Sequence, residues 1–284
     1  MDRADIPKKR CPYCNSEAKL DFAIWGRPYF RCGSCDLMYR GDLQVELKRD
    51  LFRHFEREYF SEYAHDQLSG SRNQIYTHIL DVIEKETAVG RILDVGCGCG
   101  FFLKEAKDRG WNMEGVEPSK ESVDYATILL GGNFVHAGTL QDFPALGEFD
   151  VVTLIDALGF SSTPWSDIER IRTLLKPGGL LFIRCSNSFL HAFLFKISIR
   201  LMMDSFVSEL VVFHKYPLTP RFILRLLRDY GFSNVNIRNA KPSGGGLPLR
   251  FLKSAISIIA NSLYYLSRRR IIIGPSLEVM ERKP

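Results

Sequence analysis

Two pairs of cysteines near the start of the chain have the spacing of a metal site. Cys11 and Cys14 form one Cys-x-x-Cys pair, and Cys32 and Cys35 form a second pair after 17 intervening residues. Each pair can supply two thiolates to one ion, and two pairs complete the tetrahedral set that zinc prefers. The segment between them is too short to bury a core, so metal binding would supply folding free energy. Four thiolates leave no open coordination position, and we therefore expect a structural Zn²⁺ site.

A second candidate site is the glycine-rich run ILDVGCGCG at positions 92–100. Glycines at 96, 98 and 100 allow a tight turn whose backbone amides can approach a ligand closely. Asp94 would repel a pyrophosphate but suits a cationic ligand or an amino group. Glu117 ends the next apolar segment, where an acidic side chain can bind both hydroxyls of a ribose. A dinucleotide-binding dehydrogenase is the alternative, but its G-x-G-x-x-G fingerprint has the third glycine one residue later.

Alternating strand-like and helical segments must position these residues. Short apolar runs predict strands at 91–95, 113–116, 134–136, 149–155, 180–184 and 233–238. Amphipathic segments between them predict helices at 101–109, 120–130, 166–175 and 220–230, the third stopped by Pro177-Gly178-Gly179. This alternation is typical of an α/β, doubly wound, parallel sheet, in which ligands bind beyond the carboxyl ends of the strands.

Five runs, in this order, resemble one family. ILDVGCGCG, GVEPS, FDVVTLIDALG, LLKPGGLLFI and HKYPLTPRFILRLLRDYGF are similar to class I S-adenosylmethionine (SAM)-dependent methyltransferases. The resemblance is to small-molecule enzymes with an N-terminal cysteine-rich lobe, and it covers about residues 60–240. It implies SAM as the cofactor and a Rossmann-like, seven-stranded sheet. Its last strand, Leu277 to Arg282, would be antiparallel and lie beside the fifth.

The resemblance also implies a role for individual residues of the cofactor site. It places the amino-acid part of SAM on Asp94, Gly96, Gly98 and Gly100, the ribose on Glu117, the adenine on Pro118, Ser119, Asp142 and Phe143, and the sulfonium or the substrate at Asp156.

Methyl transfer from a sulfonium depends on positioning and desolvation, and it needs a base only when the acceptor must lose a proton. The candidate bases are His214 and Tyr216, with His191 third; the alternative for His214 is a packing role. Many members of the family carry Glu-His shortly after the fourth strand, where this chain has Gly159-Phe160. Phe160 therefore suggests an apolar wall of the acceptor pocket.

Four regions organise the chain: a zinc-ribbon lobe at 1–40, a helical linker or cap at 41–88, the methyltransferase core at 89–242 and a tail at 243–284. The tail contains an apolar seam at three- and four-residue steps, followed by Arg268–Arg270. This helix either packs on the core or lies on an anionic membrane surface through residues 247–270. The apolar seam of the tail consists of Leu249, Leu252, Ile256, Ile259, Leu263 and Leu266.

A further apolar segment, at 189–203, predicts a lid over the acceptor pocket.

Composition limits the classes of function. The 284 residues are 45% hydrophobic and 25% charged with a net charge of +5, which indicates a globular protein and is too mild to indicate a nucleic-acid binder. No apolar signal segment precedes Cys11, so we expect a cytoplasmic protein with reduced cysteines.

We expect methyl transfer to a small molecule or a glycan, possibly lipid-linked. The alternatives are an RNA methyltransferase that uses the zinc lobe for binding, and a non-enzymatic adaptor. Asp156-Ala-Leu-Gly lacks the Pro-Pro motif of many enzymes that methylate base amino groups.

Overall fold

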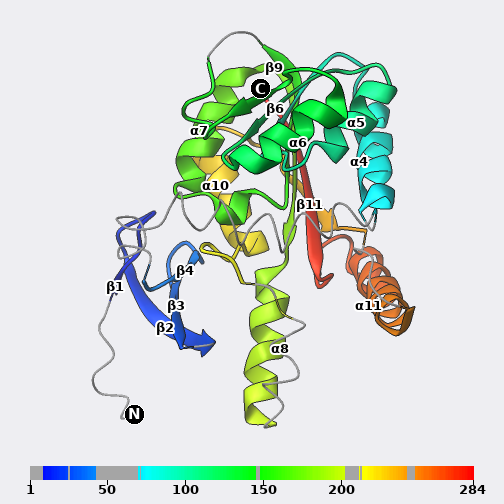
Figure 1. The fold of residues 1–284 in the computed structure, drawn as a ribbon. Coiled ribbons are helices and arrows are strands. Elements are labelled where there is room, and N and C mark those ends of the chain that lie inside the picture. The colour runs from blue at the N-terminus through cyan, green and yellow to red at the C-terminus, as the bar shows by residue number, and fades with distance from the viewer. Residues whose placement is uncertain are drawn as a thin grey trace.

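The computed structural model describes residues 9–24, 26–42, 70, 72–144, 148–201, 211, 213–241 and 247–284, with only the backbone for 247–254. These residues form a four-stranded N-terminal lobe and an α/β core with a seven-stranded sheet (Figure 1). Most of the predicted linker, 43–69, lies outside the described residues. Of that region the structure describes one helix, α4 (Asn73–Glu86).

The large sheet has the strand order β10-β11-β9-β8-β5-β6-β7. The five strands β5 to β9 pair in parallel, and β11 runs antiparallel to both of its neighbours, β9 and β10. The predicted α/β sheet and its antiparallel last strand are therefore confirmed. The strands are β5 (Arg91–Val95), β6 (Asn112–Glu117), β7 (Val135–Ala137), β8 (Phe149–Ile155), β9 (Leu175–Ser186), β10 (Asn236–Asn239) and β11 (Ser276–Arg282).

Side chains alternate between the two faces of each central strand and feed two apolar cores. Ile92 and Val151 face a core shared with α4, α5 (Phe101–Asp108) and α6 (Lys120–Leu130). Leu93 and Val152 face a core shared with α7 (Pro164–Leu174) and α10 (Pro220–Asp229). Because both faces are buried, these strands are apolar throughout, as expected of a parallel sheet.

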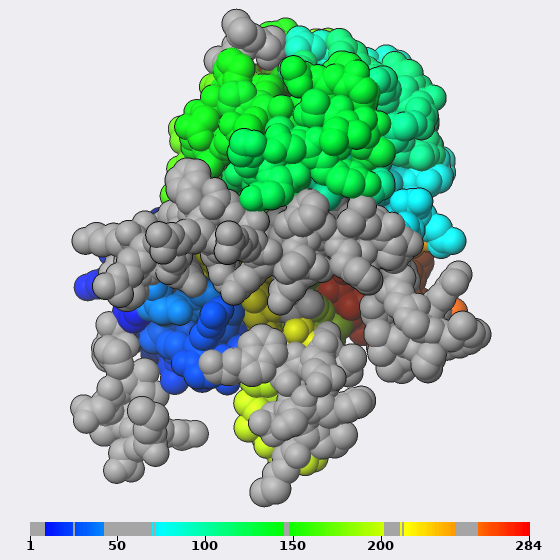
Figure 2. Space-filling view, in the orientation of Figure 1, coloured from blue at the N-terminus to red at the C-terminus, as the bar shows by residue number. Residues whose placement is uncertain are grey.

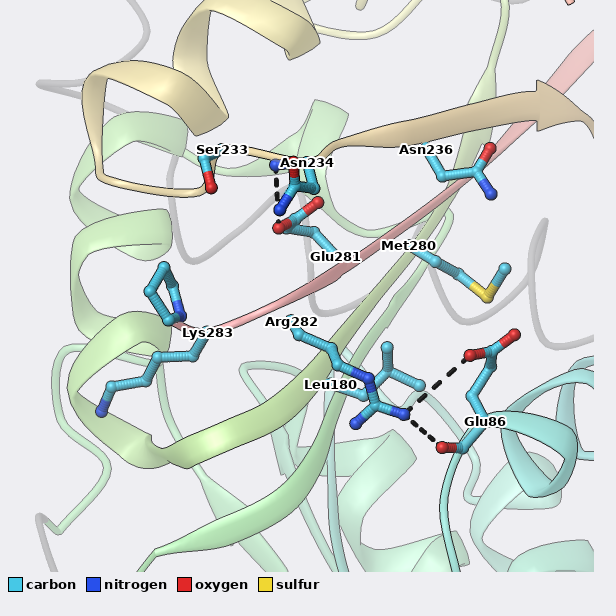
Figure 3. Close-up of a pocket in the computed structure, with 10 residues that line it drawn as sticks. Glu86, Leu180, Ser233, Asn234, Asn236, Met280, Glu281, Arg282 and Lys283 are labelled. Atoms are coloured by element: carbon cyan, nitrogen blue, oxygen red, sulfur yellow. Dashed lines mark hydrogen bonds and ion pairs between the residues drawn. The ribbon is translucent and has the colours of Figure 1, made fainter.

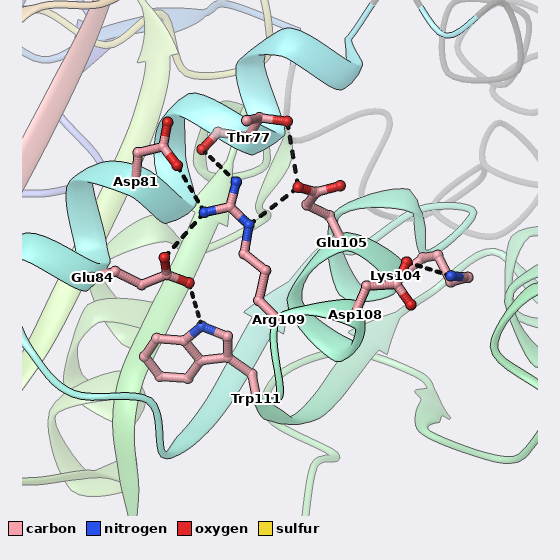
Figure 4. A network of polar contacts seen from close by, with 8 residues as sticks. All are labelled: Thr77, Asp81, Glu84, Lys104, Glu105, Asp108, Arg109 and Trp111. Carbon is pink, nitrogen blue, oxygen red and sulfur yellow. Dashed lines mark hydrogen bonds and ion pairs between the residues drawn. The ribbon is translucent and has the colours of Figure 1, made fainter.

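A polar network centred on Arg109 fastens α4 to α5 (Figure 4). Its Nη1 lies 2.8 Å from Asp81 and 3.0 Å from Glu84 on α4, while its Nε lies 3.1 Å from Glu105 on α5. The indole of Trp111 donates to the same Glu84 at 3.1 Å. This network holds together two of the helices that cover one face of the sheet.

Two sequence predictions about this sheet differ from the structure. Helix α7 ends at Leu174 as expected, but β9 begins at once, so that Pro177-Gly178-Gly179 lies inside the strand. The pairing of β9 with β8 shifts register there, and the positive φ of Gly178 (73°) accommodates the irregularity. Strand β10 begins at Asn236 rather than at 233, because its pairs with β11 run only from Asn236 to Asn239.

The N-terminal lobe is an antiparallel sheet of β1 (Lys9–Arg10), β2 (Glu17–Ile24), β3 (Arg27–Cys32) and β4 (Met38–Arg40). In the space-filling view it lies below the α/β core, with α8 (Ser188–Arg200) on the same side (Figure 2). Helix α8 extends away from the core (Figure 1) rather than folding across the sheet edge as a lid would. The tail forms α11 (Leu247–Leu266), which is followed by β11.

Candidate cofactor and acceptor site

The glycine run forms the turn between β5 and α5, at the carboxyl edge of the sheet. Gly96 and Gly100 have φ angles of 72° and 81°, which side chains disfavour. A Cβ on Gly96 would lie 2.6 Å from the Cβ of Ala157, and one on Gly100 would lie 3.0 Å from the Cβ of Ala126. Both glycines are therefore required sterically, since the loop is pressed between α6 and the end of β8.

Asp94 is a buried carboxyl directly below this loop. Its Oδ1 accepts a hydrogen bond of 2.6 Å from the hydroxyl of Thr153 on the neighbouring strand β8. Burial raises the pKa of Asp94 to about 7; the Thr153 hydrogen bond opposes that shift, and the nearby charge of Glu117 adds to it. A cation in the crevice would stabilise the ionised form of this carboxyl.

Glu117 ends β6 and closes the other side of the crevice. Its carboxylate accepts from the backbone N–H groups of Gly98 and Ser119, each at 2.9 Å. Burial raises the pKa of Glu117, while these two backbone donors lower it. The acidic side chain thus holds the glycine loop against the start of α6, so a loss of Glu117 would disturb loop and ligand together.

The residues expected near the adenine are placed in different ways. Ser119 is buried and caps α6, its hydroxyl accepting from the backbone N–H of Ser122 at 3.2 Å. Pro118 beside it is half-exposed. Asp142 is exposed and accepts from the Thr139 hydroxyl at 2.6 Å. Phe143 is buried in the core against Phe149 and His136. The adenine roles of these residues stay predictions.

Asp156, at the end of β8, lies in an ion-pair cluster that the sequence did not predict. It has a positive φ of 58° and pairs with both Arg72 and Arg184. Burial would raise its pKa, but the charges of Arg184 and Arg72 outweigh burial and hold the pKa below its usual value. Arg184 is itself buried and is the one charged residue in the apolar run LLFIRC (180–185). That charge in a buried strand was the signal available in the sequence.

The two candidate bases have different surroundings. The imidazole of His214 lies against Phe160, with ring centroids 4.0 Å apart, and burial lowers its pKa to about 4 despite the opposing charge of Asp156. The hydroxyl of Tyr216 donates to the backbone oxygen of Ser162 at 3.3 Å, and burial raises its pKa to about 12. The structure thus brings His214 and Phe160 toward Asp156, whereas the surroundings of Tyr216 disfavour a role as a base. His191 is buried beside Phe213.

The four cysteines of the lobe converge. Their sulfur atoms lie within 4.8 Å of one another, with 3.6 Å between Cys11 and Cys35 and 3.5 Å between Cys14 and Cys32. Sulfurs around a tetrahedral zinc are about 3.8 Å apart, from a Zn–S distance of about 2.3 Å. The donor set and its spacing therefore fit Zn²⁺. Cys97, Cys99 and Cys185 are buried in the core, as expected. Within the described part of the chain, no other group of metal-ligating side chains converges in this way.

The lobe packs against the segment that carries His214. The backbone N–H of Arg40 donates to the oxygen of Lys215 at 3.0 Å, and that of Tyr216 donates to the oxygen of Gly159 at 3.2 Å. The hydroxyl of Thr219, the residue that caps α10, donates to the carboxylate of Asp36 at 2.8 Å. The segment 213–217 is thus held between the lobe and the end of β8, so the lobe forms one side of the region expected to bind the acceptor.

A groove of about 340 Å³ lies elsewhere, at the edge of the sheet opposite the glycine loop. Figure 3 shows Arg282 of β11 reaching toward Glu86 at the end of α4, with Leu180 and Met280 also lining the groove. None of the predicted site residues lines it. The chemistry-bearing residues instead gather at the carboxyl edge.

The fold and the carboxyl-flanked glycine loop define a class I SAM-dependent methyltransferase. A family model described as "Methyltransferase domain" matches residues 62–237, and the chain belongs to that family. A ubiquinone biosynthesis O-methyltransferase of Aromatoleum aromaticum is 30% identical over 155 residues, which cover 50% of this chain and 66% of that protein. A second such enzyme, from Burkholderia lata, is 29% identical over 38% of this chain and 49% of its own length. The chain thus matches about half to two thirds of these curated relatives.

Solved structures agree with the fold. Magnesium protoporphyrin IX methyltransferase from Synechocystis, with bound S-adenosylhomocysteine, aligns with a TM-score of 0.55 and 14% identity, covering 84% of this chain and all of that one. A SAM-dependent methyltransferase from Thermotoga maritima, described as a possible histamine N-methyltransferase, aligns with a TM-score of 0.52 and 17% identity, covering 79% and 98%. At sequence identities this low, these alignments establish a shared fold and nothing more specific.

Proposed function

We propose that this protein transfers a methyl group from SAM to a small-molecule acceptor. The observation that carries the proposal is the crevice at the carboxyl edge of the sheet, where Asp94 and Glu117 flank a loop of three glycines. Two buried carboxyls favour a ligand with an ammonium and a sulfonium over one that carries phosphates. The family match and the shared fold support the same activity.

The residues of the chain supply position and environment rather than covalent chemistry. We propose that Asp94 binds the ammonium group of SAM and that Glu117 binds its ribose hydroxyls. We propose that Phe160 and the buried imidazole of His214, which lie in contact, form a dry wall beside the methyl group, where desolvation favours transfer from a cationic sulfur. With a pKa of about 4, His214 is neutral at pH 7 and a weak base. We therefore propose that its ring nitrogen orients the acceptor hydroxyl as a hydrogen-bond acceptor, and that the hydroxyl proton leaves to solvent as the methyl group is transferred.

For the acceptor, we propose a hydroxyl group on a small molecule or a glycan, carried on a lipid. The curated relatives named above are O-methyltransferases, which supports oxygen as the acceptor atom. The lipid is supported by the exposed apolar side chains of α8 and α11, two helices that extend from the core on the side of the sheet's carboxyl edge (Figure 1). We further propose that the lobe holds a structural Zn²⁺ through Cys11, Cys14, Cys32 and Cys35.

Calorimetric titration with SAM tests the cofactor site. Glu117→Ala should weaken SAM binding at least tenfold, since it removes the ribose acceptor and the support of the loop. Glu114→Ala is the matched control, because Glu114 lies on the same strand but pairs with Arg91 away from the loop. Binding of a nicotinamide dinucleotide in place of SAM would overturn the proposal. RNA binding with a steep dependence on salt would instead support the nucleic-acid alternative.

A further inference from the structure

Two helices of this protein expose their apolar residues instead of burying them. Sixteen large apolar side chains are exposed among the residues whose side chains are described, and thirteen of them lie in or just after two helices. Six belong to residues 189–201, in and after α8, and seven to residues 256–271, in and after α11. Isolated exposed apolar residues are ordinary, whereas a concentration on two elements marks a surface that binds something. The remaining three exposed large apolar residues, outside these two helices, are Val89, Ile128 and Phe134.

In α8 the usual distribution is reversed. Ser188, His191 and Ser198 are buried, together with Phe195, which packs against Phe22 of the lobe. The exposed positions are instead phenylalanine, leucine and isoleucine, with Phe193 54% exposed. A helix that faced only water would show the opposite pattern.

In α11 the predicted apolar seam is not the face that packs on the core. Ala260 and Tyr264 are buried, and the Tyr264 hydroxyl donates to the backbone oxygen of Ile237 on β10. Ile259 and Leu266 of the seam are 59% and 81% exposed. The alternatives of packing and membrane contact are therefore compatible, because the helix packs through one face and exposes another.

The two helices share one polar joint, which fixes their relative position. Asn187, directly before α8, donates from Nδ2 to the backbone oxygen of Gly274 at 2.9 Å. The backbone N–H of Gly274 donates to Asn239, which also contacts Asn261 of α11. In Figure 1 both helices extend from the core on the side to which β9 points. The glycine loop lies at the same end of the sheet, because it follows β5, which runs parallel to β8 and β9.

Within α8 and α11, and among the described residues that directly follow them, the charged side chains are basic. Neither α8 nor α11 contains an aspartate or a glutamate. Arg200 ends α8, and Arg268, Arg269 and Arg270 follow α11; all four are exposed. Lys196 on α8 is partly exposed and pairs with Asp21 of the lobe. Apolar side chains framed by arginines complement the interface of a bilayer with anionic lipids. Among the described helices, none is long and apolar enough to cross a membrane.

We propose that α8 and α11 together form a docking surface for the face of an anionic lipid bilayer. Both helices lie in the interface, with their apolar side chains among the acyl chains and the arginines at the headgroups. The carboxyl edge of the sheet, from which α8 extends, then lies beside the bilayer, and a lipid-linked acceptor can reach the crevice from the membrane surface. This last step rests on the proposed methyl transfer, whereas the docking itself does not.

Flotation with phosphatidylcholine vesicles, with and without 30 mol% phosphatidylglycerol, tests the surface. The full-length protein should float with the anionic vesicles and lose binding in high salt. Phe193→Glu with Ile197→Glu in α8, and Ile259→Glu with Leu266→Glu in α11, should each lower the bound fraction at least tenfold. Ile128→Glu is the matched control, because Ile128 is 83% exposed on α6 and should leave binding unchanged.

Every variant is also titrated with SAM, which separates loss of docking from loss of folding or of the cofactor site. The proposal is overturned if the wild type floats with neither kind of vesicle, or if both double variants float with the anionic vesicles to the same extent as the wild type. It is also overturned if light scattering shows a dimer that the same variants dissociate, since a second copy of the chain would then cover the surface.

Discussion

The buried carboxyl of Asp94 makes the affinity for SAM depend on pH. Its pKa is about 7 in the empty crevice, because burial disfavours the charged form. SAM carries an ammonium group and binds the ionised carboxylate, so a proton must leave Asp94 before the cofactor binds tightly. The apparent Kd equals the Kd of the ionised form multiplied by a factor, which is one plus the ratio of protonated to ionised Asp94. This factor is about 33 at pH 5.5 and about 2 at pH 7. We expect SAM affinity to rise about 16-fold over this interval.

Isothermal titration in buffers from pH 5.5 to 7 measures this change, in a range where an α-amino group stays protonated. Asp94→Asn is the comparison, because it keeps the shape and removes the titration; its weaker affinity should be independent of pH. His214, with a pKa of about 4, titrates below the interval. A wild-type affinity as flat as that of Asp94→Asn would refute the reasoning. In the cofactor-free protein, Asp94 contributes the opposite trend to stability: its carboxyl binds a proton in the folded but not in the unfolded chain between about pH 4 and 7, so its contribution to the unfolding free energy falls as the pH rises. His214, whose pKa falls from 6.5 to about 4 on folding, acts in the other direction between these two values. The trend is therefore measured as the difference in unfolding free energy between the wild type and Asp94→Asn, which share His214.

Three further changes have definite expected results. Cys14→Ala should lower the zinc content from one ion per chain, measured by plasma mass spectrometry, and expose the lobe to proteolysis while SAM still binds; a metal-free wild type would contradict this. Thr219→Val removes both the helix cap and the bond to Asp36, and should cost about 1–2 kcal/mol in urea unfolding, whereas no change would mean that this contact does not hold the lobe. Gly96→Ala should weaken SAM binding, with partial rescue by Ala157→Gly, because the two Cβ atoms would lie 2.6 Å apart; a full-affinity single variant would contradict the packing.

The sequence predicted the sheet well because burial on both faces leaves a local signature. Phe149–Ile155 was predicted with the bounds that the structure shows, since a run of apolar, β-branched residues has few alternatives. The start of β9 was missed because Pro177-Gly178-Gly179 is a local break signal, and only pairing with β8 carries the strand through it. Local propensity cannot anticipate a partner strand.

The site was predicted only in part, for a related reason. Asp94, the glycines and Glu117 lie at strand ends that the local pattern reveals. The cluster of Asp156 with Arg72 and Arg184 joins three separate segments, and neither arginine belongs to a motif. The tail seam was identified correctly as apolar, but periodicity alone could not show that Ala260 and Tyr264 make the contact with β10.

The position of β11 has a consequence for how the protein is made. Residues 276–282 lie between β9 and β10, and within the large sheet β10 hydrogen-bonds only to β11. During translation, the ribosome releases β5 to β9 long before the strand that joins β10 to them. A nascent chain therefore exposes the edge of β9, a template for pairing with another chain, until this segment emerges. Pairing of these seven residues with β9 covers that edge and joins β10 to the sheet.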